Sequence, residues 1–212
     1  MLRVEIEYVL QTEYHPMLTQ TLIYILDTVV GLFVLAALTR FFAQAMRASF
    51  RNPLAQFIVA LTDWAVKPLR RVVPAVMGLD TASFLVAWFA QIVLWTLILA
   101  LLGMVADAQP LFWPTLLGYA LLKVFKLSVY LLMGVVIFEA VLSWVAPFHP
   151  IRPFFEALAR PFMRPLRRIV PLVGGVDLSP LILLIALQVL LMLPVALLEN
   201  EIFRLLRSFT LA

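Results

Sequence analysis

The sequence has few of the residues on which catalytic and metal sites usually depend. It contains no cysteine, which excludes disulfide bonds and thiolate metal sites. Its two histidines, His15 and His149, lie far apart in the chain, so a histidine-based metal site is not expected. Neither a GxGxxG nor a GxxxxGKS/T pattern is present, which argues against a phosphate-binding loop. We therefore expect neither a metal nor a cofactor.

Charged residues are also scarce. They make up 13% of the 212 residues, whereas hydrophobic residues make up 64%. Soluble domains are about a quarter charged and about half apolar. One soluble core cannot hide this surplus, so we expect lipid to be the solvent for much of the chain. The N-terminus carries Arg3 against Glu5, Glu7 and Glu13, unlike the basic start of a secretory signal, so the first apolar segment is expected to stay in the mature protein.

Four segments are long and apolar enough to cross a bilayer. A hydrocarbon core about 30 Å thick needs about 20 mostly apolar residues in a helix. Helix is expected because unpaired backbone groups are costly in lipid. Ser179 and Pro180 suit the start of the fourth helix, as a capping hydroxyl and a first-turn proline. The predicted spans are residues 22–42, 84–105, 127–146 and 181–198. The sequence thus predicts an all-α membrane protein.

An internal repeat organises these spans. Shifted by 97 residues, the segment 52–80 aligns with 149–177 without a gap, and 13 of the 29 pairs are identical. The matches include Arg, Pro, Gly and Asp, which shared hydrophobicity does not produce. We therefore predict two parallel tandem units, each a helix, an amphipathic basic loop and a helix. The predicted parts are a tail at 1–20, a first unit at 21–105 with its loop at 43–83, a connection at 106–126, a second unit at 127–198 with its loop at 147–180, and a tail at 199–212.

Positive charge gathers in the two loops, which an even number of spans per unit places on one side of the membrane. The loop residues are Arg47, Arg51, Lys67, Arg70, Arg71, Arg152, Arg160, Arg164, Arg167 and Arg168. The positive-inside rule predicts that both loops are cytoplasmic and both termini outside. Lys123 and Lys126 run against this rule and are expected to snorkel from near a span end.

Each loop opens with an amphipathic stretch and continues into a basic, proline-bounded turn, KPLRRVVP at 67–74 and RPLRRIVP at 164–171. An amphipathic helix of this kind can lie in the membrane interface, where arginines are attracted to anionic lipid. The simpler interpretation is that the arginines only set topology. The expected contact residues for lipid or a partner are Arg70, Arg71, Arg167, Arg168, Phe57 and Phe154.

The second loop and the start of the next span resemble a known family. The residues are Pro165, Leu166, Arg167, Arg168, Pro171, Gly174, Gly175, Asp177, Ser179 and Pro180. This pattern is similar to the YggT (YlmG) family of small bacterial membrane proteins. The first copy departs from it, with Met77 for the first glycine and Thr81-Ala82-Ser83 after Asp80.

The resemblance implies a multi-pass protein of the bacterial inner membrane with no established reaction. It also implies association with osmotic tolerance and cation uptake, with cell division or membrane organisation, and, in plastids, with assembly of c-type haem on the cytochrome b6f complex.

Five polar residues fall within or near the spans: Asp27, Arg40, Gln91, Glu139 and Gln188. Buried charges in membranes usually face protein or water. We predict an Arg40–Glu139 ion pair and a hydrogen bond between Gln91 and Gln188 across the pseudo-axis. An ion or proton path lined by Asp27, Gln91, Glu139 and Gln188 is the alternative. It is less favoured because such paths usually bring broken helices near the midplane.

Two functions stand open on the sequence. The favoured hypothesis is a non-catalytic scaffold or assembly factor that binds anionic lipid and another membrane protein. The alternative is a small cation transporter or channel subunit. An enzyme is not expected, because no set of catalytic groups lies in mutual reach. Nucleic-acid binding is not expected either, because topology explains the net charge of +4. Dimerisation through the pseudo-symmetric face is a further possibility.

Overall fold

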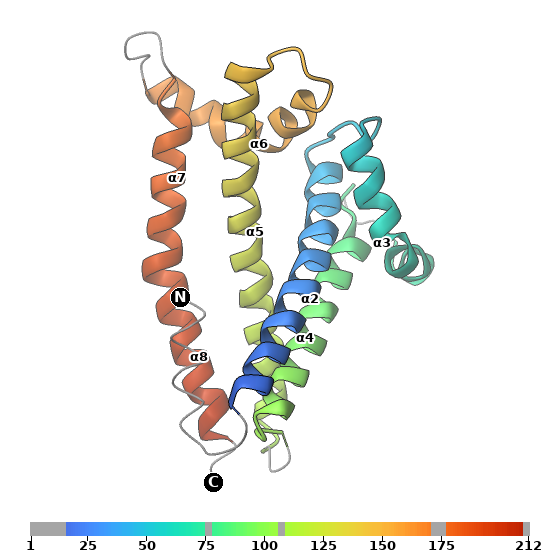
Figure 1. The fold of residues 1–212 in the computed structure, drawn as a ribbon, viewed down its shortest axis with the longest axis vertical. Helices are drawn as coiled ribbons and strands as arrows, with labels where there is room; N and C mark the ends of the chain where they lie inside the picture. The colour runs from blue at the N-terminus through green and yellow to red at the C-terminus, as the bar shows by residue number, and fades with distance from the viewer. Residues whose placement is uncertain (1–15, 75–77, 106–108, 171–176, 210–212) are drawn as a thin grey trace.

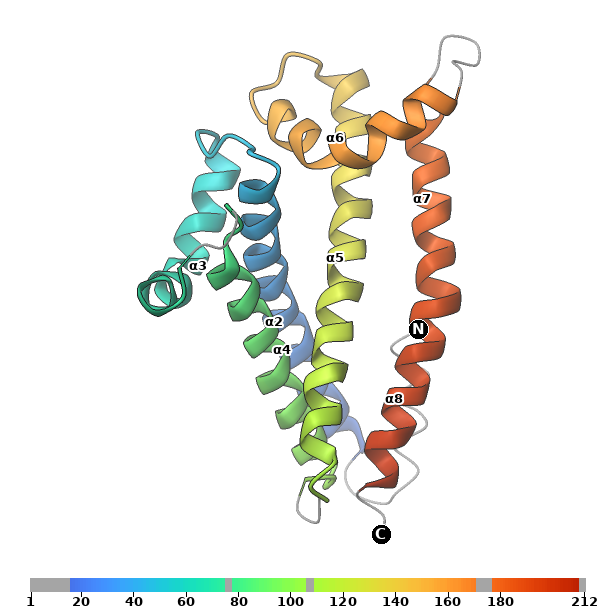
Figure 2. The same cartoon turned by 180° about the vertical axis from the view of Figure 1, so that it is seen from behind.

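The computed structural model describes residues 16–74, 78–105, 109–170 and 177–209, and helices account for nearly all of them (Figures 1 and 2). The helices are α2 Pro16–Ala45, α3 Pro53–Val72, α4 Thr81–Leu101, α5 Phe112–Val145, α6 Arg152–Ile169, α7 Ser179–Leu190, the π-helix η1 Leu191–Val195 and α8 Ala196–Ser208. No strand occurs in these residues. The predicted tail at 1–20 lies mostly outside them, as do Pro171, Gly174 and Gly175.

Four helical stretches can cross a membrane by length and composition. They are Met17–Ala45, Thr81–Leu101, Phe112–Val145 and Ser179–Ser208. Each covers most of one predicted span. The prediction of an all-α membrane protein with four spans is therefore confirmed.

Two of the spans end in the same hydrogen-bond pattern. At the end of α4, Gly103 N–H donates to Ala100 O and Met104 N–H donates to Leu99 O, with Gly103 at φ +74°. This is a Schellman motif, and it stops the helix before residue 105, where the sequence placed the span's end. The end of α2 has the same two bonds, but Arg47 occupies the left-handed position at φ +54°.

The other two spans are longer than predicted. Because α5 begins at Phe112, Lys123 and Lys126 lie inside the helix rather than at its outer end. The fourth span continues through η1 and α8, so Glu199 belongs to the helix and not to a tail. Hydropathy alone placed the span boundaries at the charged residues. In the fold these charges pair with one another, so the helices continue through them.

Helices α3 and α6 lie at the same end of the spans, and α6 crosses over them (Figures 1 and 2). Asn52 starts α3 by accepting a hydrogen bond from Ala55 N–H at 2.8 Å, with Pro53 in the first turn. The PLRR segments, predicted as turns, are helical: α3 runs through Pro68 and α6 through Pro165. The C-terminal cap of each helix is the valine that directly precedes the next proline.

Buried side chains form three clusters along the bundle. The largest joins α5, α6 and α7 at the end that α6 covers, and another joins α2, α4 and α5 near mid-span. The last packs the early part of α2, α4, the start of α5 and α8 together at the opposite end. Both α2 and α5 contribute to all three clusters, so these two helices, one from each predicted unit, connect the units along the bundle.

Candidate functional site

The same ion pair closes the basic segment of both predicted units. Arg70, at the end of α3, binds Asp80 through Nη2 and through Nε, the latter at 3.1 Å. Arg167, at the end of α6, binds Asp177 with Nε 2.7 Å from Oδ2. Arg70 and Arg167 are equivalent under the shift of 97 residues, as are the two aspartates. Each of α3 and α6, which we call the interfacial helices for their position at one end of the spans (Figure 1), is thereby tied to the start of the span that follows it.

Both aspartates also serve the first turn of the next span. Asp80 accepts a hydrogen bond from Ser83 N–H at 3.4 Å, and Asp177 accepts one from Ser179 N–H at 2.9 Å. Burial raises the pKa of Asp80, but hydrogen bonds from Arg70 and Ser83 outweigh it, so this pKa lies below its usual value. The same balance lowers the pKa of Asp177. Ser179, predicted as the cap, makes no side-chain cap bond.

In the first unit, a buried arginine joins this arrangement from the span. The Arg40 side chain is only 5% exposed, and its Nη1 lies 2.8 Å from Asp63 Oδ1 of α3. Nη1 also donates to Thr62 Oγ1 at 2.9 Å, and Nε lies 3.7 Å from Asp80 Oδ2. Lys67 contacts Asp63 at 2.7 Å, and its hydrogen bond lowers the pKa of Asp63.

In the second unit, the span contributes an acid instead. Glu139 is 3% exposed, and its Oε1 lies 3.5 Å from Arg167 Nη2. It lines a polar cavity of about 330 Å³ together with Glu156, Arg160, Arg164 and Arg167. The predicted Arg40–Glu139 pair is therefore wrong. Arg40 and Glu139 each have partners on the interfacial helix of their own unit. The prediction compared only the depths of the two residues within the spans and did not consider contacts with these helices.

The two interfacial helices present different outer faces. On α3, Phe57 is 63% exposed and Trp64 71% exposed, beside Lys67 and Arg71. On α6, Phe154 is buried and contacts Phe155 edge to face, so the structure does not place it on the outer surface. The exposed apolar side chains of α6 are Phe162 and Ile169.

The four motif arginines divide into two pairs. Arg70 and Arg167 are held by Asp80 and Asp177. Arg71 and Arg168 are exposed, and neither has an ion pair or side-chain hydrogen bond within the described part of the chain. One arginine of each PLRR segment is therefore structural, and the other is available to a ligand outside the protein.

A second group of charges lies inside the bundle, away from the interfacial helices. Glu199 of α8 binds both Lys123 and Lys126 of α5, with all three side chains less than 20% exposed. Lys123 Nζ also lies 4.2 Å from the centre of the Trp95 ring and 4.9 Å from that of Tyr119. Glu199 fell in the predicted C-terminal tail and was not among the predicted site residues. Two lysines amid apolar residues were the available signal that a membrane-buried acid had to exist.

Besides Arg40 and Glu139, two of the predicted intramembrane residues are buried or half-buried in the bundle, and one is exposed. Asp27 lies within electrostatic range of Lys123 and Lys126. Gln91 is 2% exposed, and its Oε1 has no hydrogen-bond partner among the described residues. Gln188 is exposed on α7, so the predicted Gln91–Gln188 hydrogen bond does not form. The burial difference follows from packing, because α4 packs against both α2 and α5, whereas α7 lies at the edge of the bundle (Figure 1).

The described residues offer no set of ligands for a metal site. No group of three or more His, Cys, Asp or Glu side chains gathers there to hold an ion. The acids that are buried in the bundle and at α3 and α6 are occupied by arginine or lysine instead.

Comparison with known families decides the classification. The CCB3/YggT family model matches residues 19–102 and 118–198. The chain belongs to the CCB3/YggT family. The two matched segments agree with the two predicted tandem units, and together they cover all four spans.

Three relatives illustrate the match. YggT of Escherichia coli K12 is 36% identical over 171 residues, which are 80% of this chain and 87% of that protein. A Vibrio alginolyticus protein from the proC 3′ region is 36% identical over 166 residues, 78% and 88% of the two chains. PA0392 of Pseudomonas aeruginosa is 38% identical over 173 residues, 81% and 86% of the two chains. All three are described as uncharacterized, and no solved structure matches the chain.

Proposed function

We propose that this YggT-family protein is a non-catalytic membrane scaffold or assembly factor. Its α3 and α6 helices bind anionic lipid and a membrane-protein partner at one face of the membrane. The observation that carries the proposal is the division of the arginine pairs. Arg70 and Arg167 fix the helices to the spans, and Arg71 and Arg168 are left exposed beside them.

The chemistry of α3 supports a role at the membrane interface. Its inner face packs on the bundle through Ala55, Ile58 and Val66. Its outer face carries Phe57 and Trp64, large rings that are costly to leave in water. Aromatic rings beside lysine and arginine are typical of helices that lie in the headgroup layer. An apolar outer face of this kind also suits a partner's membrane span.

The proposal includes a location and an orientation. The protein lies in the bacterial inner membrane with α3 and α6 on the cytoplasmic side and both termini outside. The gathering of lysine and arginine at the α3 and α6 end supports this orientation. Anionic lipids of the cytoplasmic leaflet attract exposed arginines with about 1 kcal/mol each.

Cation transport is the second candidate, and one observation favours it. The fourth span is interrupted by the π-helix Leu191–Val195, which contains Pro194 and precedes Glu199. Such interruptions often mark functional sites. The charges beside it weigh against transport, because a cation near Glu199 meets the ammonium groups of Lys123 and Lys126. Flux through purified protein in liposomes that falls with Asp27→Asn would favour transport over the scaffold.

The scaffold proposal is tested by separating the two kinds of arginine. The double variant Arg71→Gln with Arg168→Gln removes only exposed charge, so it should insert and fold normally. Loss of about 2 kcal/mol of lipid attraction corresponds to a roughly 30-fold weaker association with phosphatidylglycerol vesicles. The same variant should lose the partner that co-purifies with the wild type in mild detergent.

The matched control is Arg204→Gln with Arg207→Gln, which removes the same formal charge at the opposite end of the bundle. It should leave both the vesicle association and the co-purifying partner unchanged. Equal behaviour of the two double variants would show that charge alone, and not the α3 and α6 surface, governs the association, and the proposal would fail.

A further inference from the structure

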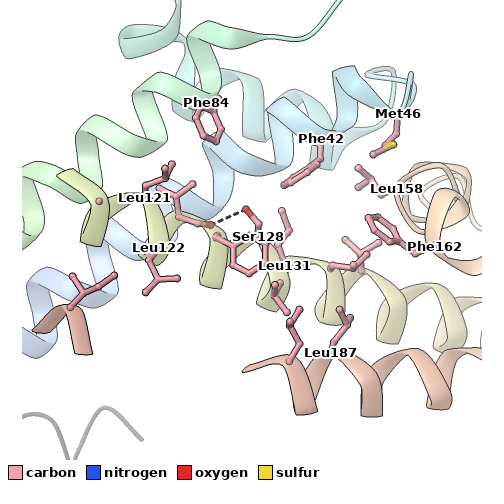
Figure 3. Close-up of a pocket in the computed structure, with 18 residues that line it drawn as sticks. Phe42, Met46, Phe84, Leu121, Leu122, Ser128, Leu131, Leu158, Phe162 and Leu187 are labelled. Atoms are coloured by element: carbon pink, nitrogen blue, oxygen red, sulfur yellow. Dashed lines mark hydrogen bonds between the residues drawn. The ribbon is translucent and has the colours of Figure 1, made fainter. Parts of the chain in front are cut away.

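A long apolar groove separates the two predicted units. It has a volume of about 740 Å³ and is bounded by α2 and α4 on one side and by α5, α6 and α7 on the other. Figure 3 shows Phe42, Leu131, Leu158 and Phe162 pointing into the same space. Ser128 is the only hydroxyl-bearing residue in the lining, and its Oγ donates to Val124 O at 2.8 Å. The groove therefore has no free polar group for a polar ligand.

The dimensions of the groove restrict its occupant. Its lining on α5 runs from Gly118 to Val135, which at about 1.5 Å per residue is about 26 Å. A helix with its side chains is about 10–12 Å across, so a helix enclosed over this length needs roughly 2100–2900 Å³. The free space of the groove is about 1620 Å³ even when its open side is included. The groove is too small to enclose a partner's span, and a single extended hydrocarbon chain is a narrower occupant that fits its elongated, apolar shape.

Charge distinguishes the two ends of the groove. Gly118 and Ile202 line one end. At the other end, the lining residue Met46 is followed by Arg47, and Phe162 of α6 lies between Arg160 and Arg164 in sequence. Arg160 and Arg164 line the polar cavity on the opposite face of α6. Arg160 is paired there with Glu156 at 3.5 Å, so the exposed cation on the groove's own side is Arg47.

We propose that the groove is a binding site for one anionic phospholipid. An acyl chain lies along α5 between the two units, and the phosphate lies at the α6 end beside Arg47. This site goes beyond the surface contact proposed above, because it lies inside the bundle and does not use Arg71 or Arg168. Lipid held there acts as a filler that completes the packing between the units.

Two glycines on α5 provide the test. A Cβ added to Gly118 or to Gly134 meets no atom within 4 Å, so both positions accept a larger side chain. Only Gly118 lines the groove. Gly118→Phe should fill one end of the groove without disturbing the helix, and Gly134→Phe is the matched control on the same helix. Leu132→Trp, toward the α6 end of the groove, is the second filling variant.

Each protein is purified in mild detergent after exposure to vesicles of phosphatidylglycerol and phosphatidylcholine. Retained lipid is then counted by native mass spectrometry. We expect the wild type and Gly134→Phe to retain one phospholipid, enriched in phosphatidylglycerol, and the two filling variants to retain at least fivefold less. A wild type without retained phospholipid, or equal retention in Gly118→Phe and Gly134→Phe, overturns the proposal. Because Arg71→Gln with Arg168→Gln leaves the groove intact, its retained lipid distinguishes failure of this site from failure of the surface contact.

Discussion

The two repeat units solve the same packing problem with charges of opposite sign. In the first, the span contributes Arg40 and the interfacial helix contributes Asp63. In the second, the span contributes Glu139, which pairs with Arg167 of the interfacial helix. Arg160, at the position equivalent to Asp63, pairs instead with Glu156 of its own helix. The first network is the more closed of the two, with Arg40 and Asp80 at most 5% exposed, whereas the second opens into a polar cavity. Both units therefore join a span to its interfacial helix by charge, but the positions that make the contact are not equivalent under the shift of 97 residues.

The units differ further at the opposite end of the bundle. Glu199 forms ion pairs with Lys123 and Lys126 in the second unit, and we call this group of three the staple. The equivalent positions of the first unit hold only apolar residues, namely Leu102, Leu26 and Val29. The second unit therefore holds α8 to α5 by charge, where the first holds its spans together by apolar packing.

The largest predicted effect comes from breaking this staple. Glu199→Gln leaves two ammonium groups with too few partners in the membrane, and we expect a loss of stability of about 4 kcal/mol. Thermal unfolding in detergent measures it, with the exposed Glu201→Gln as the control. Replacing the three residues together by Met, Met and Leu should restore folding, because removing a buried ion network whole is often neutral. A Glu199→Gln protein as stable as the control would contradict the staple.

The next effect separates the two networks directly. Arg40→Gln removes a buried charge that bonds to α3, so we expect a loss of about 3 kcal/mol. Glu139→Gln keeps an acceptor for Arg167 in a cavity that can admit water, so we expect about 1 kcal/mol. Chemical denaturation of both proteins in the same detergent compares the two. A larger cost for Glu139→Gln would show that the second network is the closed one.

The smallest effect is a pH dependence of both units. Asp80 and Asp177 have pKa values lowered in the folded protein, so their stabilisation is present above the unfolded value near about 3.9 and is lost as pH falls through the folded value. We expect melting temperature to fall below about pH 4. Asp80→Asn should weaken this dependence more than Asp177→Asn, because Asp80 is buried and Asp177 half-exposed. Identical pH profiles for wild type and Asp80→Asn would contradict it.

The sequence was sufficient for the four spans because hydropathy and the repeat depend on many residues at once. The individual partners were not predictable in the same way. Arg40 and Glu139 were paired because they lie at similar depth, but partner choice depends on how α3 and α6 fold back onto the spans. The exposure of Gln188 likewise depends on which face of α7 meets its neighbour, and no sequence period shows this because nearly every face of α7 is apolar. On the amphipathic α6 the apolar face was visible in the sequence, but the fold packs Phe154 on that face against the bundle and not outward.

The length of α5 was underestimated for a similar reason. The apolar stretch that predicts this span begins only after Lys126, because a lysine in lipid is costly. The helix continues because an acid 73 residues later in the sequence neutralises it. Only the three-dimensional contact makes the earlier half of α5 compatible with the membrane.

The end of α2 carries a cost that the end of α4 avoids. A left-handed backbone is unfavourable by about 1–2 kcal/mol for a residue with a Cβ, and glycine escapes this penalty. The chain nevertheless places Arg47, and not glycine, in that conformation next to Met46. Arg47→Gly should therefore raise the melting temperature and, at the same time, weaken retention of the phospholipid proposed for the groove. The proposed lipid site thus explains why a cation is kept at this junction despite its cost in stability.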